Sequence, residues 1–159
     1  MKKMKYTAIA VMLLLCVLLY GCGADDPAKS RMQALIGINQ EISGAYDEAL
    51  AAECHNGTYV GLAEGSVISY KGIPFAEPPV GELRWKNPVP AGDRTGVYEA
   101  EYFGKSPIQT EWFSEVGSYY LQGEDCLTLN VWTNTEGPSE GKTVMVFFHG
   151  GSYGWGGHE

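Results

Sequence analysis

Two stretches in the second half of the chain have the hydrophobic pattern of β-strands. Residues 127–132, Leu-Thr-Leu-Asn-Val-Trp, alternate apolar and polar side chains, which is typical of a strand with one buried face. Residues 143–148, Thr-Val-Met-Val-Phe-Phe, are apolar after the first position, which predicts a strand covered on both faces. The glycines, proline and serine at 136–141 predict a turn between the two strands.

Shorter β-prone runs occur earlier in the chain. Residues 58–60 and 67–70 are rich in β-branched and aromatic side chains, and the glycine-containing stretch 61–66 between them predicts a hairpin. Residues 72–90 contain five prolines. Because proline disrupts a regular helix and a central strand, we expect an ordered loop over this range.

One helix is predicted ahead of these strands. Ser30 is a residue type that favours a helix N-cap, and the apolar residues after it recur at steps of three and four. We therefore expect a short helix that serves for packing or as a tether, although Gly37 and Gly44 weaken it. Its apolar positions are Leu35, Ile38, Ile42, Ala45 or Tyr46, and Ala49.

The first residues have the pattern of a targeting segment. Three lysines, at positions 2, 3 and 5, precede an uncharged apolar run over 6–20, as in a signal peptide. The run is shorter than the roughly 20 apolar residues of a membrane-spanning helix. Residues 19–22, Leu-Tyr-Gly-Cys, resemble the lipobox of bacterial lipoproteins, which implies cleavage before Cys22 and diacylation of its thiol. The alternative is an ordinary signal peptide with an incidental cysteine.

These patterns predict three parts. We expect a signal peptide at 1–21, a lipid-anchored tether with the helix at 22–55, and a folded domain at 56–159. A lipid anchor would make the membrane a partner and would place the protein in the bacterial cell envelope, on the outer side of the cytoplasmic membrane. Without the anchor, the protein would be secreted.

The charge and the cysteines of the sequence limit which partners and bridges the folded part can have. The 159 residues include 19 acidic and 11 basic side chains, for a net charge of −8. Because nucleic-acid binding needs clustered cations, we expect no nucleic-acid partner. Outside the targeting segment only Cys54 and Cys126 remain, and either a bridge between them or two free thiols is compatible with the sequence.

Three motifs follow one another along the second part of the chain. Residues 70–81 read Tyr-Lys-Gly-Ile-Pro-Phe-Ala-Glu-Pro-Pro-Val-Gly, and Leu-Arg-Trp follows at 83–85. Residues 124–132 read Glu-Asp-Cys-Leu-Thr-Leu-Asn-Val-Trp, and His-Gly-Gly-Ser stands at 149–152 after the apolar run. Together, and in this order, they resemble the type-B carboxylesterase and cholinesterase family of α/β-hydrolases.

The resemblance implies a fold and an activity. The fold class would be α/β, with this chain forming an incomplete opening portion of an α/β-hydrolase: the N-terminal β-hairpin and the first strands of the central sheet. The activity would be hydrolysis of small-molecule carboxylic esters, with no cofactor and no metal. The resemblance also implies an ion pair between Arg84 and Glu124, which a planar guanidinium suits.

The loop at His149, Gly150, Gly151 and Ser152 is the candidate site. Acyl transfer develops negative charge on the carbonyl oxygen, and backbone N–H groups aimed at that oxygen stabilise it. The resemblance assigns this oxyanion-hole role to the N–H groups of Gly151 and Ser152. Ser152 stands where the family often has glycine, which should be tolerated if its φ is not positive.

A second interpretation makes Ser152 the nucleophile. Residues 150–154 satisfy the Gly-x-Ser-x-Gly pattern of a nucleophile elbow. An elbow opens a helix, however, and the glycine-rich residues 155–159 disfavour a first helical turn.

The family's catalytic serine, acid and histidine come after the oxyanion loop, and no residue of this chain matches them. His55, His149 and His158 are the only histidines of the sequence, and none matches the catalytic base. We therefore expect the N-terminal segment of a serine carboxylic-ester hydrolase, inactive by itself. The alternatives are a non-catalytic cholinesterase-like binding module and a truncated remnant.

Overall fold

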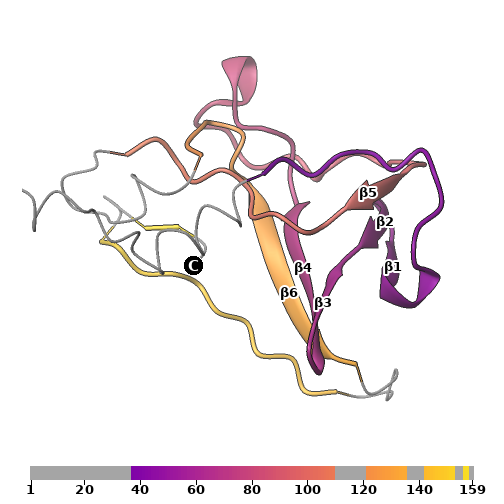
Figure 1. Ribbon diagram of the computed structural model, residues 1–159. Coiled ribbons are helices and arrows are strands. Elements are labelled where there is room, and N and C mark those ends of the chain that lie inside the picture. Colours follow the sequence, from indigo (N-terminus) through magenta and orange to yellow (C-terminus); the bar gives the residue numbers. More distant parts are fainter. Residues whose placement is uncertain (1–36, 110–120, 136–141, 153–155, 158–159) are drawn as a thin grey trace, which may run out of the picture. The chain divides into compact units, whose positions relative to one another are not determined.

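The computed structural model describes residues 37–109, 121–135, 142–152 and 156–157 (Figure 1). All of them belong to the second of two units into which the chain divides, Met32–Glu159. The signal peptide, Cys22, the start of the expected helix, the turn at 136–141 and His158 lie outside the described residues.

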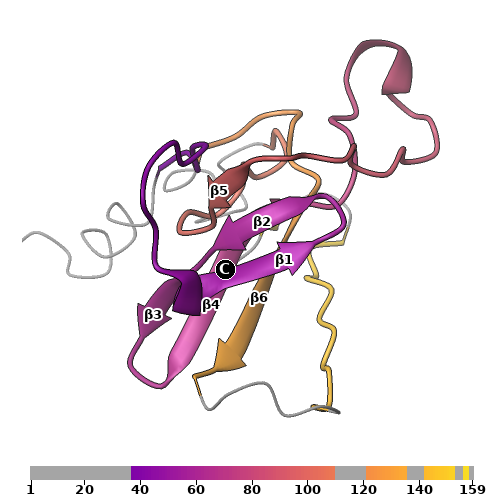
Figure 2. The same ribbon diagram turned by 90° about the vertical axis from the view of Figure 1, so that its right-hand side faces the viewer.

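A first three-stranded sheet has the order β1-β2-β5. Strands β1 (Ala51–Cys54) and β2 (Gly57–Val60) form an antiparallel hairpin, in which Ala51 pairs with Val60. Strand β5 (Val97–Glu99) lies parallel to β2, with Tyr59 opposite Tyr98. Figure 2 shows this hairpin beside β5.

A second three-stranded sheet has the order β3-β4-β6 and is antiparallel throughout. Its strands are β3 (Leu62–Glu64), β4 (Val67–Pro74) and β6 (Thr128–Asn134). The register between β4 and β6 shifts between Tyr70 and Ile73. Gly72 lies in this irregularity with a φ of 70°, a conformation that glycine adopts without steric cost.

The core lies where the two sheets meet. Tyr59 of β2, Ile68 and Tyr70 of β4, and Ala100 after β5 form its buried cluster. This core forms because β2 contributes an aromatic side chain and β4 contributes an aromatic and a β-branched one, and these side chains point into the same interior. Figure 1 shows β4 and β6 side by side, with β2 and β5 to their right.

The helix expected from Ser30 to Ala49 is wrong over its described part. Residues 37–47 are not helical, and only a 3-10 turn, η1 (Glu48–Leu50), follows them. The segment instead runs along β5, where the N–H of Ile42 donates to the carbonyl of Val97 at 2.8 Å. Pairing with a neighbouring strand satisfies the backbone here, and it outweighs the helical spacing of the apolar residues.

The Asn39 side chain fixes this extended path. Its amide donates to the carbonyls of Lys71 and Tyr102, at 2.9 Å each, and its oxygen accepts from the N–H groups of Glu101 and Tyr102. One side chain therefore ties three segments together.

The hairpin predicted between residues 58–60 and 67–70 is also wrong in its pairing. Both strands exist, but β2 pairs with β1 and β5. The hairpin partner of β4 is β3, which lies within the stretch expected to be a turn, and Gly65 and Ser66 make the actual turn; β4 also pairs with β6. The proline-rich region is loop from residue 75 onward, with a 3-10 turn η2 (Gly81–Leu83), whereas residues 72–74 complete β4.

Strand β6 overlaps the predicted strand over residues 128–132, and its apolar residues are on the more exposed face. Its apolar residues Leu129 and Val131 are about two-fifths exposed, and the polar side chain of Asn130 accepts a bond from the N–H of Gly72 at 2.9 Å. The predicted strand at 143–148 is not formed: the described segment 142–150 is assigned to no strand, and Phe147 and Phe148 are 84% and 86% exposed.

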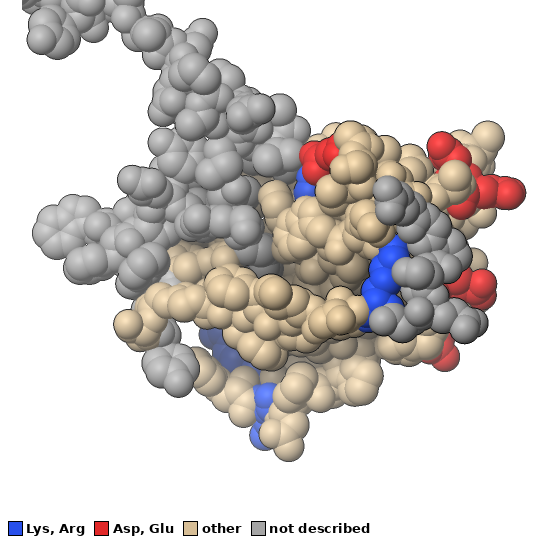
Figure 3. All heavy atoms as spheres, turned by 90° about the horizontal axis from the view of Figure 1, so that it is seen from below, with Lys and Arg blue, Asp and Glu red and all other residues tan. Residues whose placement is uncertain are grey.

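Figure 3 shows one face of the molecule. On it, uncharged residues make up most of the described surface, most acidic side chains lie toward one edge, and the basic ones are scattered. In the four described ranges, no helix is long and apolar enough to cross a membrane. The same residues contain no cluster of three or more histidine, cysteine or acidic side chains that could hold a metal ion.

Candidate functional site

The glycine-rich loop after the extended segment contains two consecutive residues with positive φ. Gly151 has a φ of 127° and Ser152 a φ of 52°. Ser152 therefore occupies the left-handed region that favours glycine, so the condition under which serine would be tolerated freely is not met. A non-glycine residue in this region costs roughly 1–2 kcal/mol.

The carbonyl of Gly150 has close neighbours on two sides. The Nδ1 atom of His149 lies 2.8 Å from this oxygen. Gly156 packs on it as well, since a Cβ at Gly156 would lie 2.6 Å from the same oxygen and 2.7 Å from Nδ1 of His149. The loop thus folds back on itself, and only a glycine fits at position 156.

Gln109 reaches the loop from another part of the chain, and no sequence motif pointed to it. Its side-chain Nε2 donates to the carbonyl of Gly156 at 2.8 Å, and its Oε1 accepts from the N–H of Gly156 at 2.9 Å. Its proximity to a glycine-rich turn depends on a long-range contact, and the sequence carries no signal for such a contact.

Arg84 and Glu124, predicted as an ion pair, are brought together. The guanidinium of Arg84 contacts the carboxylate of Glu124, and both side chains are partly exposed. The contact links the proline-rich loop to the segment that leads into β6. Neither residue lies in the glycine-rich loop, so the pair supports the framework of the site.

The Ser152 elbow would need a helix to begin after the serine. Residues 153–155 lie outside the described ones, and residues 156–157 are not helical. The positive φ of Gly156, 124°, is not a helical value.

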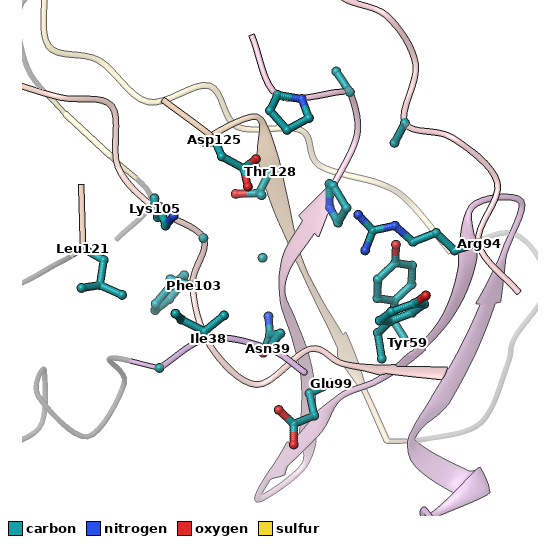
Figure 4. Close-up of a pocket in the computed structure, with 18 of the residues that line it drawn as sticks. Ile38, Asn39, Tyr59, Arg94, Glu99, Phe103, Lys105, Leu121, Asp125 and Thr128 are labelled. Carbon is teal, nitrogen blue, oxygen red and sulfur yellow. The ribbon is translucent and has the colours of Figure 1, made fainter. Parts of the chain in front are cut away.

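A separate cleft of about 220 Å³ lies between the loops at one end of β4 (Figure 4). Charged side chains line it, among them Arg94, Lys105 and Asp125 from loops and Glu99 from the end of β5. The described residues that line it include no histidine, serine or cysteine. Among the described residues, this cleft therefore has no serine–histidine or cysteine–histidine pair.

Three titratable groups of the framework have shifted pKa values. Burial raises the pKa of Tyr59, and the nearby Arg94 opposes this shift. Burial also raises the pKa of Tyr70, with a smaller contribution from Cys54. Burial, and secondarily the charge of Asp125, raises the pKa of Cys126. Cys54 and Cys126 are both free thiols in the structure.

Comparison with known proteins identifies the family of this chain. A sequence model described as the carboxylesterase family matches residues 53–159. The chain belongs to the carboxylesterase family. Its match begins at the first sheet and includes the proline-rich loop, β6 and the glycine-rich loop, so the three motifs of the sequence fall within one family match.

Individual carboxylesterase relatives agree. Fumonisin B1 esterase of Sphingopyxis macrogoltabida is 36% identical over 110 residues, which are 69% of this chain and 20% of that protein. Para-nitrobenzyl esterase of Bacillus subtilis is 37% identical over 99 residues, 61% of this chain and 20% of that protein. This carboxylesterase chain spans about a fifth of the length of these curated relatives.

Solved structures identify the fold. A thermophilic PNB esterase is similar with a TM-score of 0.63 and 34% sequence identity, over 68% of this chain and 23% of that one. The described strands of this carboxylesterase chain are thus the opening portion of an α/β-hydrolase fold, as the motifs implied.

Proposed function

We propose that this chain is the N-terminal segment of a serine carboxylic-ester hydrolase that acts on small-molecule esters. In this proposal the backbone N–H groups of Gly151 and Ser152 stabilise the oxyanion. One observation carries the proposal: the family match includes the glycine-rich loop.

The chemistry assigned to this loop follows from the charge that develops in acyl transfer. When a nucleophile attacks an ester carbonyl, the carbonyl oxygen becomes negative, and two fixed N–H donors stabilise it without reorganisation. One such donor contributes roughly 10²–10³-fold to kcat in a serine hydrolase. The nucleophile, its base and the acid are assigned to chain beyond these residues, in the family's order.

The apolar surface of the described residues supports a larger protein. Leu129, Val131 and Trp132 on β6 are 40–50% exposed, and the five residues of segment 144–148 are 69–93% exposed. Large exposed apolar areas are unusual on soluble monomers. Further strands and helices of a complete α/β-hydrolase would cover both surfaces.

The lipid anchor belongs to the same proposal, although Cys22 lies outside the described residues. The charged start, the apolar run and the residues Leu-Tyr-Gly-Cys at 19–22 support lipidation of Cys22 and attachment to the bacterial cell envelope. Residues 37–54 of the expected tether are part of the folded unit, so the residues between Cys22 and residue 37 would place the hydrolase domain outside the cytoplasmic membrane.

The gene provides the first test. We expect its reading frame to continue past codon 159 into a Gly-x-Ser-x-Gly sequence, followed by an acidic residue and a histidine. The complete gene product should hydrolyse p-nitrophenyl esters and react covalently with a fluorophosphonate. A continuing frame without the serine would indicate a non-catalytic binding module, and a stop codon would indicate a truncated remnant.

A further inference from the structure

The side-chain amide of Gln109 pairs with the backbone of Gly156 as a neighbouring strand would. Its Nε2 donates to the carbonyl of Gly156 at 2.8 Å, and its Oε1 accepts from the N–H of Gly156 at 2.9 Å. An amide side chain has a donor and an acceptor at its end, so it satisfies both groups of one residue at once. A carboxylate could only accept, and an apolar side chain could do neither.

Gln109 is itself held in place. Its backbone N–H donates to Oε1 of Gln122 at 2.9 Å, and its Nε2 also lies 3.1 Å from the carbonyl of Pro107. The segments around Ser106 and Gln122 pair with each other, because the N–H of Ser106 donates to Leu121 and that of Gly123 donates to Ser106, both at 2.9 Å. Ser106 is 2% exposed, so the paired segments next to Gln109 are buried at this point.

Gly156 connects Gln109 to the glycine-rich loop. Its backbone packs on the carbonyl of Gly150 and the ring of His149, so closely that a Cβ would approach both within 2.7 Å. The peptide between Gly150 and Gly151 is planar, and its N–H points opposite to its carbonyl. Whatever holds the Gly150 oxygen therefore sets the direction of the Gly151 N–H.

We propose that Gln109 is a positioning residue for the Gly151 oxyanion donor, acting through Gly156 and the Gly150 carbonyl. The inference rests on the proposed function, since it assigns the donor role to Gly151. Gln109 does not touch the reacting atoms. Its loss leaves the donor in the molecule but lets the peptide plane rotate away from the oxyanion.

The test uses the complete gene product and two length-matched substitutions. Gln109→Met keeps the size of the side chain and removes both bonds to Gly156. Gln40→Met is the control, because the side chain of Gln40 is exposed and donates to the carbonyl of Ile38, two residues earlier. Gln109→Glu keeps the acceptor for the Gly156 N–H but sets a carboxylate oxygen against the Gly156 carbonyl, so its effect should be at least as large; it replaces Gln109→Met if that variant does not fold.

Three measurements separate positioning from a general structural role. In Gln109→Met we expect kcat for a p-nitrophenyl ester to fall by about 10–10²-fold with KM within about twofold, less than the loss of a whole donor. Affinity for a trifluoromethyl ketone, which mimics the tetrahedral intermediate, should fall by the same factor as kcat. Amide hydrogen exchange at Gly151 and Gly156 should be at least tenfold faster, and Gln40→Met should change none of these values.

Failure of this inference and failure of the proposed function give different results. If the wild-type gene product neither hydrolyses esters nor reacts with a fluorophosphonate, the proposed function fails, and the positioning role fails with it. If the wild type is active but Gln109→Met keeps its kcat and its ketone affinity, only the positioning role is overturned. A loss in KM alone would overturn it as well.

Discussion

Arg84 and Glu124 form an ion pair between the proline-rich loop and the segment that leads into β6. Trp85, the next residue after Arg84, is 97% exposed and has a φ of 61°, an uncommon conformation for a bulky residue. The pair is therefore a polar contact between this end of the loop and the segment before β6, next to an exposed aromatic residue with positive φ.

Breaking this pair should loosen the loop by a small amount. Because both side chains are partly exposed, Arg84→Met should cost about 1 kcal/mol or less in local stability. Chymotrypsin cleavage after Trp85 in the complete gene product should become faster by up to about fivefold. The difference should shrink in 1 M salt, which screens exposed charges.

Arg94→Met is the matched control for this measurement. Arg94 lies 5.1 Å above the ring of Tyr98, on a different loop, so its loss should not change cleavage after Trp85. Equal cleavage rates in the wild type and Arg84→Met would show that the pair does not restrain the loop. A difference that persists in 1 M salt would point to packing instead of charge.

The sequence predicted strand positions better than strand partners. Alternation located β6, and β-branched and aromatic runs located β2 and the start of β4, because these signals lie within a few residues. Pairing depends on contacts between distant residues, such as Tyr59 with Tyr98, and short stretches carry no signal for it. The helix over 30–49 failed for the same reason, since Asn39 bonds to residues far along the chain.

At the candidate site, the sequence indicated the glycine-rich loop but not its support. The motif His-Gly-Gly-Ser is local and could be found from its residues alone. The positive φ of Ser152 could not be predicted, because serine usually avoids that region. The contact of Gln109 with Gly156 could not be predicted either, because it joins two segments that only the fold brings together.

The shifted pKa of Cys126 gives a prediction for its reactivity. Burial, and then the charge of Asp125, raises this pKa, so the reactive thiolate forms at higher pH in the folded protein than in the unfolded one. The rate of alkylation of Cys126 by iodoacetamide, followed by peptide mass spectrometry, should reach half its maximum at a higher pH without urea than in urea.

The raised pKa of Cys126 also makes the stability of the folded state depend on pH. Below the pKa of the unfolded thiol, both states keep the proton and Cys126 contributes no pH dependence. As the pH rises above that value, the unfolded chain ionises first, so the contribution of Cys126 to the stability of the folded state falls. Asp125→Asn should move the alkylation midpoint partly back, and Asp93→Asn should not move it. Identical midpoints with and without urea would contradict the shift.

The 159 residues expressed alone should neither hydrolyse esters nor unfold cooperatively. The exposed apolar segment 144–148 and the exposed apolar face of β6 lack the cover that a stable domain requires. We expect strong binding of a hydrophobic dye and aggregation on heating. Phe147→Glu should reduce both, whereas Thr143→Glu, at an exposed polar position, should change them little. A sharp thermal transition in a purified monomer would be the contrary result.

Lipidation of Cys22 should direct the protein to the membrane fraction of a bacterial cell. Radiolabelled palmitate should be incorporated into the wild type and not into Cys22→Ser. Cys54→Ser is the control, since Cys54 lies outside the targeting segment and should leave the label unchanged. Label that survives Cys22→Ser would contradict the prediction, and a soluble secreted form would indicate an ordinary signal peptide.

Substitutions at Ser152 separate the oxyanion donor from the nucleophile in the complete gene product. Ser152→Ala keeps the backbone N–H, so kcat should change little if the N–H is the working group. Ser152→Gly should also keep kcat, and it removes a left-handed serine that costs roughly 1–2 kcal/mol. Gly151→Pro removes a donor and cannot adopt a φ of 127°, so it should lower kcat by at least about 10²–10³-fold.

The nucleophile interpretation gives the opposite result for the same serine. If the Ser152 hydroxyl attacks the ester, both Ser152→Ala and Ser152→Gly should lower kcat by on the order of 10⁶-fold, as nucleophile substitutions do in serine hydrolases. Fluorophosphonate labelling would then disappear in both variants. Retained labelling with nearly unchanged kcat leaves the attack to a serine outside this loop and keeps the backbone of Gly151 and Ser152 as the donors.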